Sequence, residues 1–67
     1  MRVSSSNIKS FWYSRKTHTL TVAFVGGRAY RYYNVPPAVV TGLYIAPSHG
    51  RYFYYNIRTS YNYERIR

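Results

Sequence analysis

Two segments of the chain place arginine and tyrosine side chains next to each other. Residues 28–33 read Arg-Ala-Tyr-Arg-Tyr-Tyr, and residues 51–58 read Arg-Tyr-Phe-Tyr-Tyr-Asn-Ile-Arg. A guanidinium holds a phosphate through two parallel hydrogen bonds, and a phenol ring offers a flat face on which an unpaired base stacks for about 1–3 kcal/mol. Single-stranded RNA is recognised by such combinations. The sequence therefore indicates seven candidate nucleic-acid-binding residues in these segments, and Arg65 near the C-terminus is the eighth: Arg28, Tyr30, Arg31, Tyr32, Arg51, Tyr54, Arg58 and Arg65.

A structural role is the alternative for several of these residues. A chain of 67 residues without cysteine has no disulfide to stabilise it, so large aromatic side chains must supply much of its core. Tyr30, Tyr32 and Phe53 fit a core role as well as a binding role. The arginines, for their part, could form a solvated surface without a ligand.

The balance of charges is the most unusual property of the composition. Ten lysines and arginines stand against one acid, Glu64, which gives a formal net charge of +9. At most one ion pair between side chains can form, and the remaining positive charges repel one another unless an anion relieves them. We therefore expect a polyanion, above all RNA, as the partner. An acidic protein surface is the alternative, because arginine and tyrosine are also frequent hot-spot residues of protein interfaces.

The composition leaves few groups for catalysis or for metal binding. A single acid excludes a pair of catalytic carboxylates, and the lack of cysteine excludes thiolate sites. His18 and His49 lie in predicted loops and form no recognised metal-binding spacing with Glu64. A ribosome-dependent endoribonuclease that acts through arginine and tyrosine is the enzymatic alternative. The prediction is a protein without catalytic residues, cofactor or metal.

Alternating hydrophobic residues predict three strands in the first half of the chain. Residues 8–13 form a short aromatic run, residues 19–25 alternate with a period of two, and residues 28–33 resume that alternation after Gly26-Gly27. Paired glycines permit the positive φ angles that a tight hairpin turn requires. The last two strands should therefore form a hairpin.

The register of this hairpin decides which way its tyrosines point. A two-residue turn at Gly26-Gly27 pairs Ala23 with Tyr30 and places the tyrosines on the face of small residues. A three-residue loop, Gly26-Gly27-Arg28, pairs Phe24 with Tyr30, so that the tyrosines join the core and Arg31 faces away from it. A slip of one residue exchanges the two faces. The sequence leaves both registers open.

The second half of the chain predicts two short helices and a closing strand. Asn34 or the residue after it is the expected cap of a first helix, which includes Pro36-Pro37 and ends near Ala46. Ser48 is the expected cap of a second helix. Residues 61–66 alternate as a final strand. The fold class is therefore α+β: a small antiparallel β-meander with two short helices and a closing C-terminal strand.

Several short motifs follow one another in a recognisable order along the chain. They are Leu20-x-Val22-x-Phe24, Tyr30-x-Tyr32, Val35-Pro36, Ala46-Pro47-Ser48-x-Gly50-x-Tyr52-Phe53 and Ile57-Arg58 followed by Tyr61. This ordered set resembles the KTSC domain and covers residues 4–66, which implies a single KTSC-like domain over residues 1–67. That family occurs as small bacterial and phage proteins and at the C-terminus of some lysyl-tRNA synthetases, an association that implies RNA binding.

The chain also departs from the pattern of that family. Tyr54 stands where the pattern leads us to expect asparagine, and Ala38 and Val39 stand where glutamates are usual. The absence of those glutamates makes this chain more basic than the family pattern implies, so a role shared by the family could be sharpened or changed here.

Two expectations from different classes of protein result. The first is a cytoplasmic, non-enzymatic RNA-binding module, because neither a signal sequence nor a membrane span is recognisable. Its arginines would contact phosphates, and its exposed tyrosines would stack on bases. The second is a phage- or host-encoded interaction protein that binds an acidic surface of another protein, such as RNA polymerase or a nuclease, and modulates it.

Overall fold

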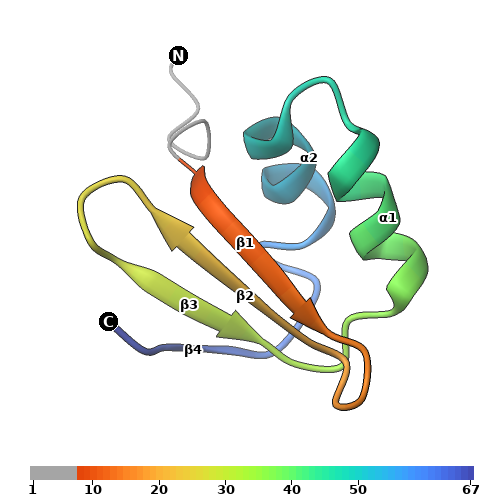
Figure 1. The fold of residues 1–67 in the computed structure, drawn as a ribbon, viewed down its shortest axis with the longest axis horizontal. Coiled ribbons are helices and arrows are strands. Elements are labelled where there is room, and N and C mark those ends of the chain that lie inside the picture. The colour runs from red at the N-terminus through yellow and green to blue at the C-terminus, as the bar shows by residue number, and fades with distance from the viewer. Residues whose placement is uncertain (1–7) are drawn as a thin grey trace.

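The computed structural model describes residues 8–67 and has two layers, a sheet and a pair of helices (Figure 1). The sheet is antiparallel, with its four strands in the order β1-β2-β3-β4. The strands are β1 (Ile8–Ser14), β2 (Thr19–Phe24), β3 (Ala29–Tyr32) and β4 (Tyr63–Arg65), and the helices α1 (Pro37–Ile45) and α2 (His49–Asn56) lie between β3 and β4 in the chain. The predicted α+β fold with a closing C-terminal strand is confirmed.

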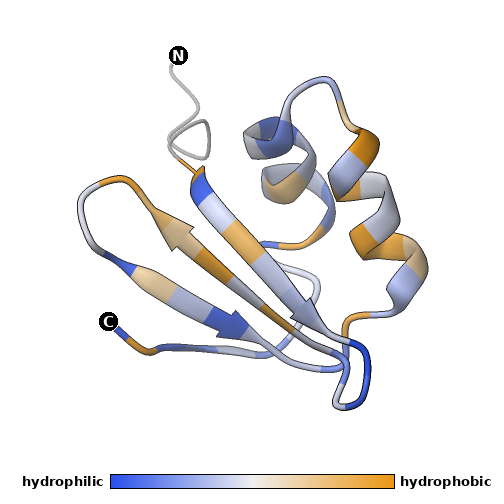
Figure 2. Ribbon diagram, in the orientation of Figure 1, coloured by the Kyte–Doolittle hydropathy of each residue, from blue (hydrophilic) through white to orange (hydrophobic). Residues whose placement is uncertain are grey.

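The hydrophobic core lies between the sheet and the helices. Apolar side chains of the central strand β2 meet apolar side chains of both helices, and these positions appear among the hydrophobic segments in Figure 2. The buried cluster consists of Leu20, Val22, Tyr32, Val35, Val40, Leu43, Phe53 and Ile57. Two of its eight members are aromatic, and most of the partly buried side chains around it are aromatic too, as the short chain requires.

The β2–β3 hairpin adopts a register that differs from both predicted alternatives. Tyr30 pairs with Val22, and the loop contains Val25 together with the two glycines. The Phe24 backbone N–H donates to the Arg28 carbonyl oxygen (2.8 Å) and closes the loop. Gly26 and Gly27 have φ angles of +105° and +95°, so both positions favour glycine.

The face assignment of the hairpin nevertheless matches one of the two alternatives. The observed register is shifted by two residues from the predicted three-residue loop, and a shift of two preserves the faces. Tyr30 and Tyr32 therefore lie on the side of the sheet that the helices cover. Arg31, paired with Thr21, lies on the opposite side.

The two helices begin and end close to the predicted positions, but their caps differ. Pro36 is the N-cap of α1, and no side chain makes a capping hydrogen bond there, so the predicted cap at Asn34 or its neighbour is wrong. Asn34 instead takes a positive φ of 57° in the connection from β3. Ser48 caps α2 as predicted, because its Oγ accepts a hydrogen bond from the Arg51 backbone N–H (3.2 Å).

The closing strand is shorter than predicted. Strand pairing covers Tyr63–Arg65 rather than residues 61–66, because the chain turns through residues 57–60 after α2 before it reaches β3. Neither helix of residues 8–67 has the length and hydrophobicity needed to cross a membrane.

Candidate nucleic-acid interface

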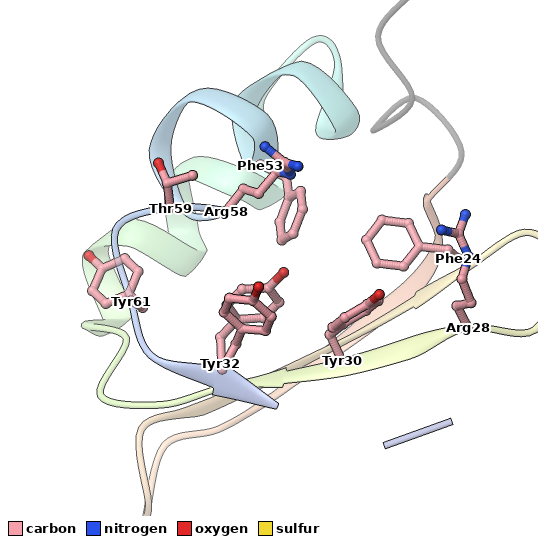
Figure 3. Close-up of a pocket in the computed structure, with 9 residues that line it drawn as sticks. Phe24, Arg28, Tyr30, Tyr32, Phe53, Arg58, Thr59 and Tyr61 are labelled. Atoms are coloured by element: carbon pink, nitrogen blue, oxygen red, sulfur yellow. The ribbon is translucent and has the colours of Figure 1, made fainter. Parts of the chain in front are cut away.

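A pocket of about 320 Å³ opens between the helix-covered face of the sheet and the segment that follows α2 (Figure 3). Strands β2, β3 and β4 supply one side, and α2 with residues 58–61 supplies the other. Aromatic rings and two arginines make up most of its lining. The lining residues are Phe24, Arg28, Tyr30, Tyr32, Phe53, Arg58, Thr59, Tyr61 and Tyr63.

The base of the pocket is the aromatic part of the hydrophobic core. Tyr32 and Phe53 are almost completely buried, and their rings meet edge to face with centroids 5.3 Å apart. Phe24 contacts Phe53 in the same manner at 5.7 Å. Edge-to-face contacts between close-packed rings hold each other in place, so this part of the pocket is preformed.

A row of tyrosines from β3 and β4 forms the more accessible wall. The β3–β4 register pairs Tyr32 with Tyr63, and side chains of directly paired residues share one face of the sheet. The Tyr32 and Tyr63 rings stack with centroids 5.3 Å apart and an interplanar angle of 30°, and Tyr30 is tilted against Tyr63 at 5.9 Å. Tyr63 is 55% exposed, which makes it the most accessible aromatic side chain among the described lining residues.

Two arginines from different parts of the chain stand at the rim. Arg28 follows the hairpin loop, and its guanidinium carbon lies 5.9 Å from the centre of the Phe24 ring. Arg58 follows α2, and its guanidinium carbon lies 5.2 Å from the centre of the Tyr54 ring. Glu64 is the single acid of the sequence, and it pairs with Arg31 (3.9 Å). Among residues 8–67, Arg28 and Arg58 therefore have no carboxylate side chain as a partner.

The environment of the pocket keeps its central phenol protonated. Burial, together with the neighbouring Tyr63 and Tyr30 hydroxyls, raises the pKa of Tyr32 to about 12, and Arg58 offsets part of this rise. At neutral pH the Tyr32 hydroxyl is uncharged, as that of an ordinary tyrosine is, and the raised pKa extends this state to higher pH. The pocket as a whole combines flat apolar rings with positive charge and hydroxyl groups, which suits a ligand that is flat and anionic.

Comparison with known proteins identifies the fold. The family model of the KTSC domain matches residues 4–61. The chain belongs to the KTSC domain family. A solved KTSC domain protein from Yersinia pestis superposes with a TM-score of 0.85 at 31% sequence identity, and the match covers 100% of this chain and 94% of that protein.

Several relatives contain this KTSC domain as a small part of a larger protein. Lysine–tRNA ligases of Nostoc punctiforme and Trichormus variabilis are 39% and 38% identical to it over 66 residues. The match takes in 98% of this chain but 12% of each ligase. A Stutzerimonas stutzeri protein of similar size is 43% identical over 51 residues, which is 76% of this chain and 72% of that protein.

The KTSC fold brings together half of the residues that the sequence indicated. Arg28, Tyr30, Tyr32 and Arg58 line the pocket. Tyr54 lies beside it, half-buried, beneath the Arg58 guanidinium. Of these, Tyr32 is only 3% exposed, so it supports the tyrosine row and has little ring surface to offer a ligand.

The other three candidate residues lie outside the pocket. Arg31 is on the opposite face of the sheet and pairs with Glu64. Arg51 is exposed in the first turn of α2. Arg65 pairs with Tyr30 across the β3–β4 ladder, but its Nε donates to the carbonyl oxygen of Arg67 (3.0 Å) and it does not line the pocket.

Sequence reasoning missed five lining residues of the KTSC pocket: Phe24, Phe53, Thr59, Tyr61 and Tyr63. Phe53 fits a core role as well as a binding role in the sequence, and both Phe24 and Phe53 belong to the core packing and to the pocket lining in the structure. Tyr63 carried a usable signal, because the closing strand alternates with a period of two and had to pair with some strand of the sheet. Which strand it pairs with depends on the path of the chain through both helices.

Neither histidine belongs to a cluster that could hold a metal. His18 is exposed in the β1–β2 turn, and the His49 ring lies edge to face with Phe11 at 5.3 Å. Residues 8–67 contain no group of three side chains from histidine, cysteine, aspartate and glutamate close enough to bind a metal ion.

Proposed function

We propose that this KTSC domain is a non-enzymatic RNA-binding module of the cytoplasm. The observation that carries the proposal is the aromatic pocket with Arg28 and Arg58 at its rim. Tyr63 and Tyr30 supply ring surface on which an unpaired base can stack, and the two guanidiniums supply contacts to phosphate. The net charge of +9 adds an attraction that acts over a longer range and speeds the encounter with a polyanion.

The relatives provide associative support for RNA as the polyanion. Proteins named lysine–tRNA ligase contain this domain, and their name includes an RNA substrate. A tethered domain that holds RNA raises the effective concentration of that RNA near the rest of the protein. The same property would serve a stand-alone domain that binds RNA on its own.

The dependence of RNA affinity on salt tests the phosphate contacts. We expect the chain to bind a short single-stranded RNA in a fluorescence anisotropy titration, with an affinity that falls steeply as salt increases. The slope of log affinity against log salt should be about −0.7 for each neutralised phosphate. An affinity that stays constant between low and moderate salt would contradict the proposal.

A pair of double variants separates the pocket from general charge. Arg28→Ala with Arg58→Ala removes both rim guanidiniums, and we expect the slope to become less steep by about 1.4, the amount for two phosphates. Arg15→Ala with Arg51→Ala removes the same charge from two exposed positions that do not line the pocket. If both variants weaken binding equally, the affinity is a property of net charge and the pocket has no special part in it.

A protein partner is the second candidate, and one observation favours it. A groove of about 460 Å³ between β1 and α1 is lined by Trp12, Tyr44 and Arg15, among other residues. Trp12 is 56% exposed and Tyr44 is 65% exposed, and aromatic anchors beside an arginine are typical of protein interfaces. An acidic protein surface with apolar residues at its centre would fit this groove.

Purification from a cell lysate separates the two candidates. RNA binding predicts that the protein retains nucleic acid, which is released by nuclease treatment. The protein-partner candidate predicts an acidic protein that remains bound after nuclease treatment and is lost in Trp12→Ala. Retention of the acidic protein alone, without nucleic acid, would favour the second candidate over the first.

A further inference from the structure

The groove between β1 and α1 runs along the free edge of the sheet. β1 is an outer strand, and α1 lies beside it (Figure 1). Trp12 and Tyr13 both line the groove, although neighbouring side chains of a strand point to opposite faces of the sheet. Tyr13 pairs with the buried Leu20 and points toward the helices, whereas Trp12 points to the opposite face. A groove lined from both faces of an edge strand lies beside that strand, with its backbone edge as the floor.

The outer edge of β1 offers backbone groups for pairing with another strand. β1 pairs with β2 alone, and among residues 8–67 no other backbone–backbone hydrogen bond involves it. The register is irregular between Ile8 and Ser10 but regular from Ser10 to Ser14. Alternate residues of this regular stretch turn their N–H and carbonyl groups away from β2. Such an edge is a template for a further strand.

Two contacts fix the position of α1 relative to β1. The Phe11 ring meets the Tyr44 ring of α1 edge to face, with centroids 5.3 Å apart. The Tyr13 hydroxyl donates a hydrogen bond to the carbonyl oxygen of Val35, shortly before α1 begins. An extended segment paired with β1 would therefore place alternate side chains against α1 and against the exposed Trp12. Strand addition to an open sheet edge is a common mode of peptide recognition.

The charges around this edge favour an acidic occupant. Lys9 precedes the regular stretch of β1, and Arg15 and Lys16 follow it. Glu64, the single acid of the sequence, lies in β4 at the opposite edge of the sheet. A second copy of the chain paired through β1 would bring positive residues together at both ends in either strand direction, and like charges across two strands repel. An acidic segment meets an opposite charge at each end instead.

We propose that the β1 edge binds an extended acidic segment of another protein, which adds a fifth strand to the sheet in the groove beside α1. Apolar side chains of the segment face α1, and its acidic residues lie beside Lys9 and Arg15. This inference rests on the protein-partner candidate and specifies its binding mode. It does not depend on RNA binding, because the described linings of this groove and of the aromatic pocket share no residue.

A synthetic peptide serves as the probe. Its core, Val-Thr-Val-Thr-Val, favours an extended conformation and matches the length of Ser10–Ser14, and two glutamates flank the core at each end. Trp12 is the one tryptophan of the sequence, so its fluorescence reports binding at the groove. We expect a saturable change in its emission. A version with lysine in place of glutamate should bind at least about tenfold more weakly, because like charges then meet at both ends.

Methylation of the peptide N–H groups distinguishes strand pairing from attraction between charges. One version is methylated at the core valines and another at the core threonines, and only one of these two sets turns its N–H groups toward β1. The methyl group removes the donor, so we expect one version to bind at least about tenfold more weakly than the other. The glutamates are the same in both. Equal affinities of the two methylated peptides overturn the proposed pairing.

Variants of the protein locate the peptide in the groove. Trp12→Ala removes one wall and should lower the affinity for a fluorescently labelled peptide at least about fivefold. Tyr55→Ala is the matched control, because it removes an aromatic side chain of similar exposure, 68% against 56%, that does not line the groove. Circular dichroism verifies that both variants are folded. A folded Trp12→Ala variant that binds as tightly as Tyr55→Ala overturns the assignment to this groove.

Other occupants of the groove give different results. A dimer of the wild-type chain in sedimentation, with a monomer for Trp12→Ala, assigns the groove to a second copy and overturns the inference. Single-stranded RNA that displaces the labelled peptide from the double variant Arg28→Ala with Arg58→Ala as well as from the wild-type chain places RNA in the groove and overturns it too. Failure of the peptide to bind at low salt overturns this inference and leaves RNA binding in place, which the salt titration tests separately.

Discussion

At the scale of single residues, Tyr32 belongs to the core and to the candidate site at the same time. Its ring is 3% exposed, contacts Phe53 edge to face and stacks on Tyr63. A small domain cannot separate its core from its binding site, because each large aromatic ring is needed for stability. The tyrosine row is therefore rigid where it meets the core and accessible where it ends at Tyr63.

The buried Tyr32 hydroxyl should make stability fall at high pH. Its pKa is raised to about 12 in the folded state, against an ordinary value near 10 in the unfolded chain. Above pH 10 the unfolded chain releases this proton while the folded protein retains it, so the free energy of unfolding falls as the pH rises from 10 to 12. Below pH 10 both states hold the proton, and the contribution is fully present.

Urea denaturation at a series of pH values measures this effect. Relative to the Tyr32→Phe variant, which cannot titrate at this position, the wild-type chain should lose about 1–3 kcal/mol across that interval. The comparison removes the contribution of the other tyrosines and lysines, because both proteins contain them. If the free energy of unfolding depends on pH in the same way in the two proteins, Tyr32 ionises as readily in the folded state as in the unfolded one, which contradicts the prediction.

At the scale of elements, the contact between the helices depends on Gly42. The Tyr52 ring lies against this glycine, and the Tyr52 hydroxyl donates to the Val39 carbonyl oxygen of α1 (2.9 Å). A Cβ atom at position 42 would lie 2.2 Å from the Tyr52 hydroxyl oxygen and 2.7 Å from its ring carbon Cζ. Real Cβ atoms do not approach so closely, so a side chain here forces the helices apart or displaces the tyrosine.

Gly42→Ala should therefore destabilise the protein, even though alanine favours helix. Overpacking costs about 1–3 kcal/mol, which outweighs the gain of up to about 1 kcal/mol in helix propensity. The double variant with Tyr52→Ala relieves the overlap, so its loss of unfolding free energy should be smaller than the sum of the two single losses. If the losses of unfolding free energy in the two single variants add up to that of the double variant, the contact with Tyr52 does not cause the destabilisation by Gly42→Ala. Chemical denaturation of the four proteins provides the comparison.

Local signals predicted most of the elements, apart from the cap of α1, and long-range pairing accounts for the errors in the hairpin register and at the closing strand. The Ser48 cap and the start of α1 at the prolines follow from rules that concern neighbouring residues. The hairpin register does not, because Val25 can extend the strand or enter the loop, and packing of Tyr30 and Tyr32 against the helices decides between them. Tyr63 reached the pocket only through the return of the chain to β3, which no local pattern specifies.

At the scale of the whole molecule, the net charge of +9 favours the binding of a polyanion but lowers the stability of the fold through repulsion between the charges. Positive residues occur in the strands, the turns and helix α2 of residues 8–67, and the radius of gyration is 10.9 Å, so these charges repel one another at distances comparable with the Debye length of about 10 Å at 0.1 M salt. Salt should therefore stabilise the folded protein and weaken the proposed binding to RNA. A protein whose charge served solubility would mix both signs instead.

The double variant Arg28→Ala with Arg58→Ala should bind RNA more weakly and should also suffer less repulsion between its positive charges. These guanidiniums have no carboxylate partner among residues 8–67, so their loss relieves repulsion and breaks no ion pair. At low salt we expect its melting temperature to equal or exceed that of the wild-type chain, and its RNA affinity to fall. The difference in melting temperature should shrink as salt increases.

Arg31→Ala is the contrasting variant, because it breaks the pair with Glu64 on the opposite face and should leave RNA affinity nearly unchanged. A lower melting temperature for the pocket variant at low salt would mean that the rim arginines stabilise the fold, and their positions would then reflect packing rather than a ligand.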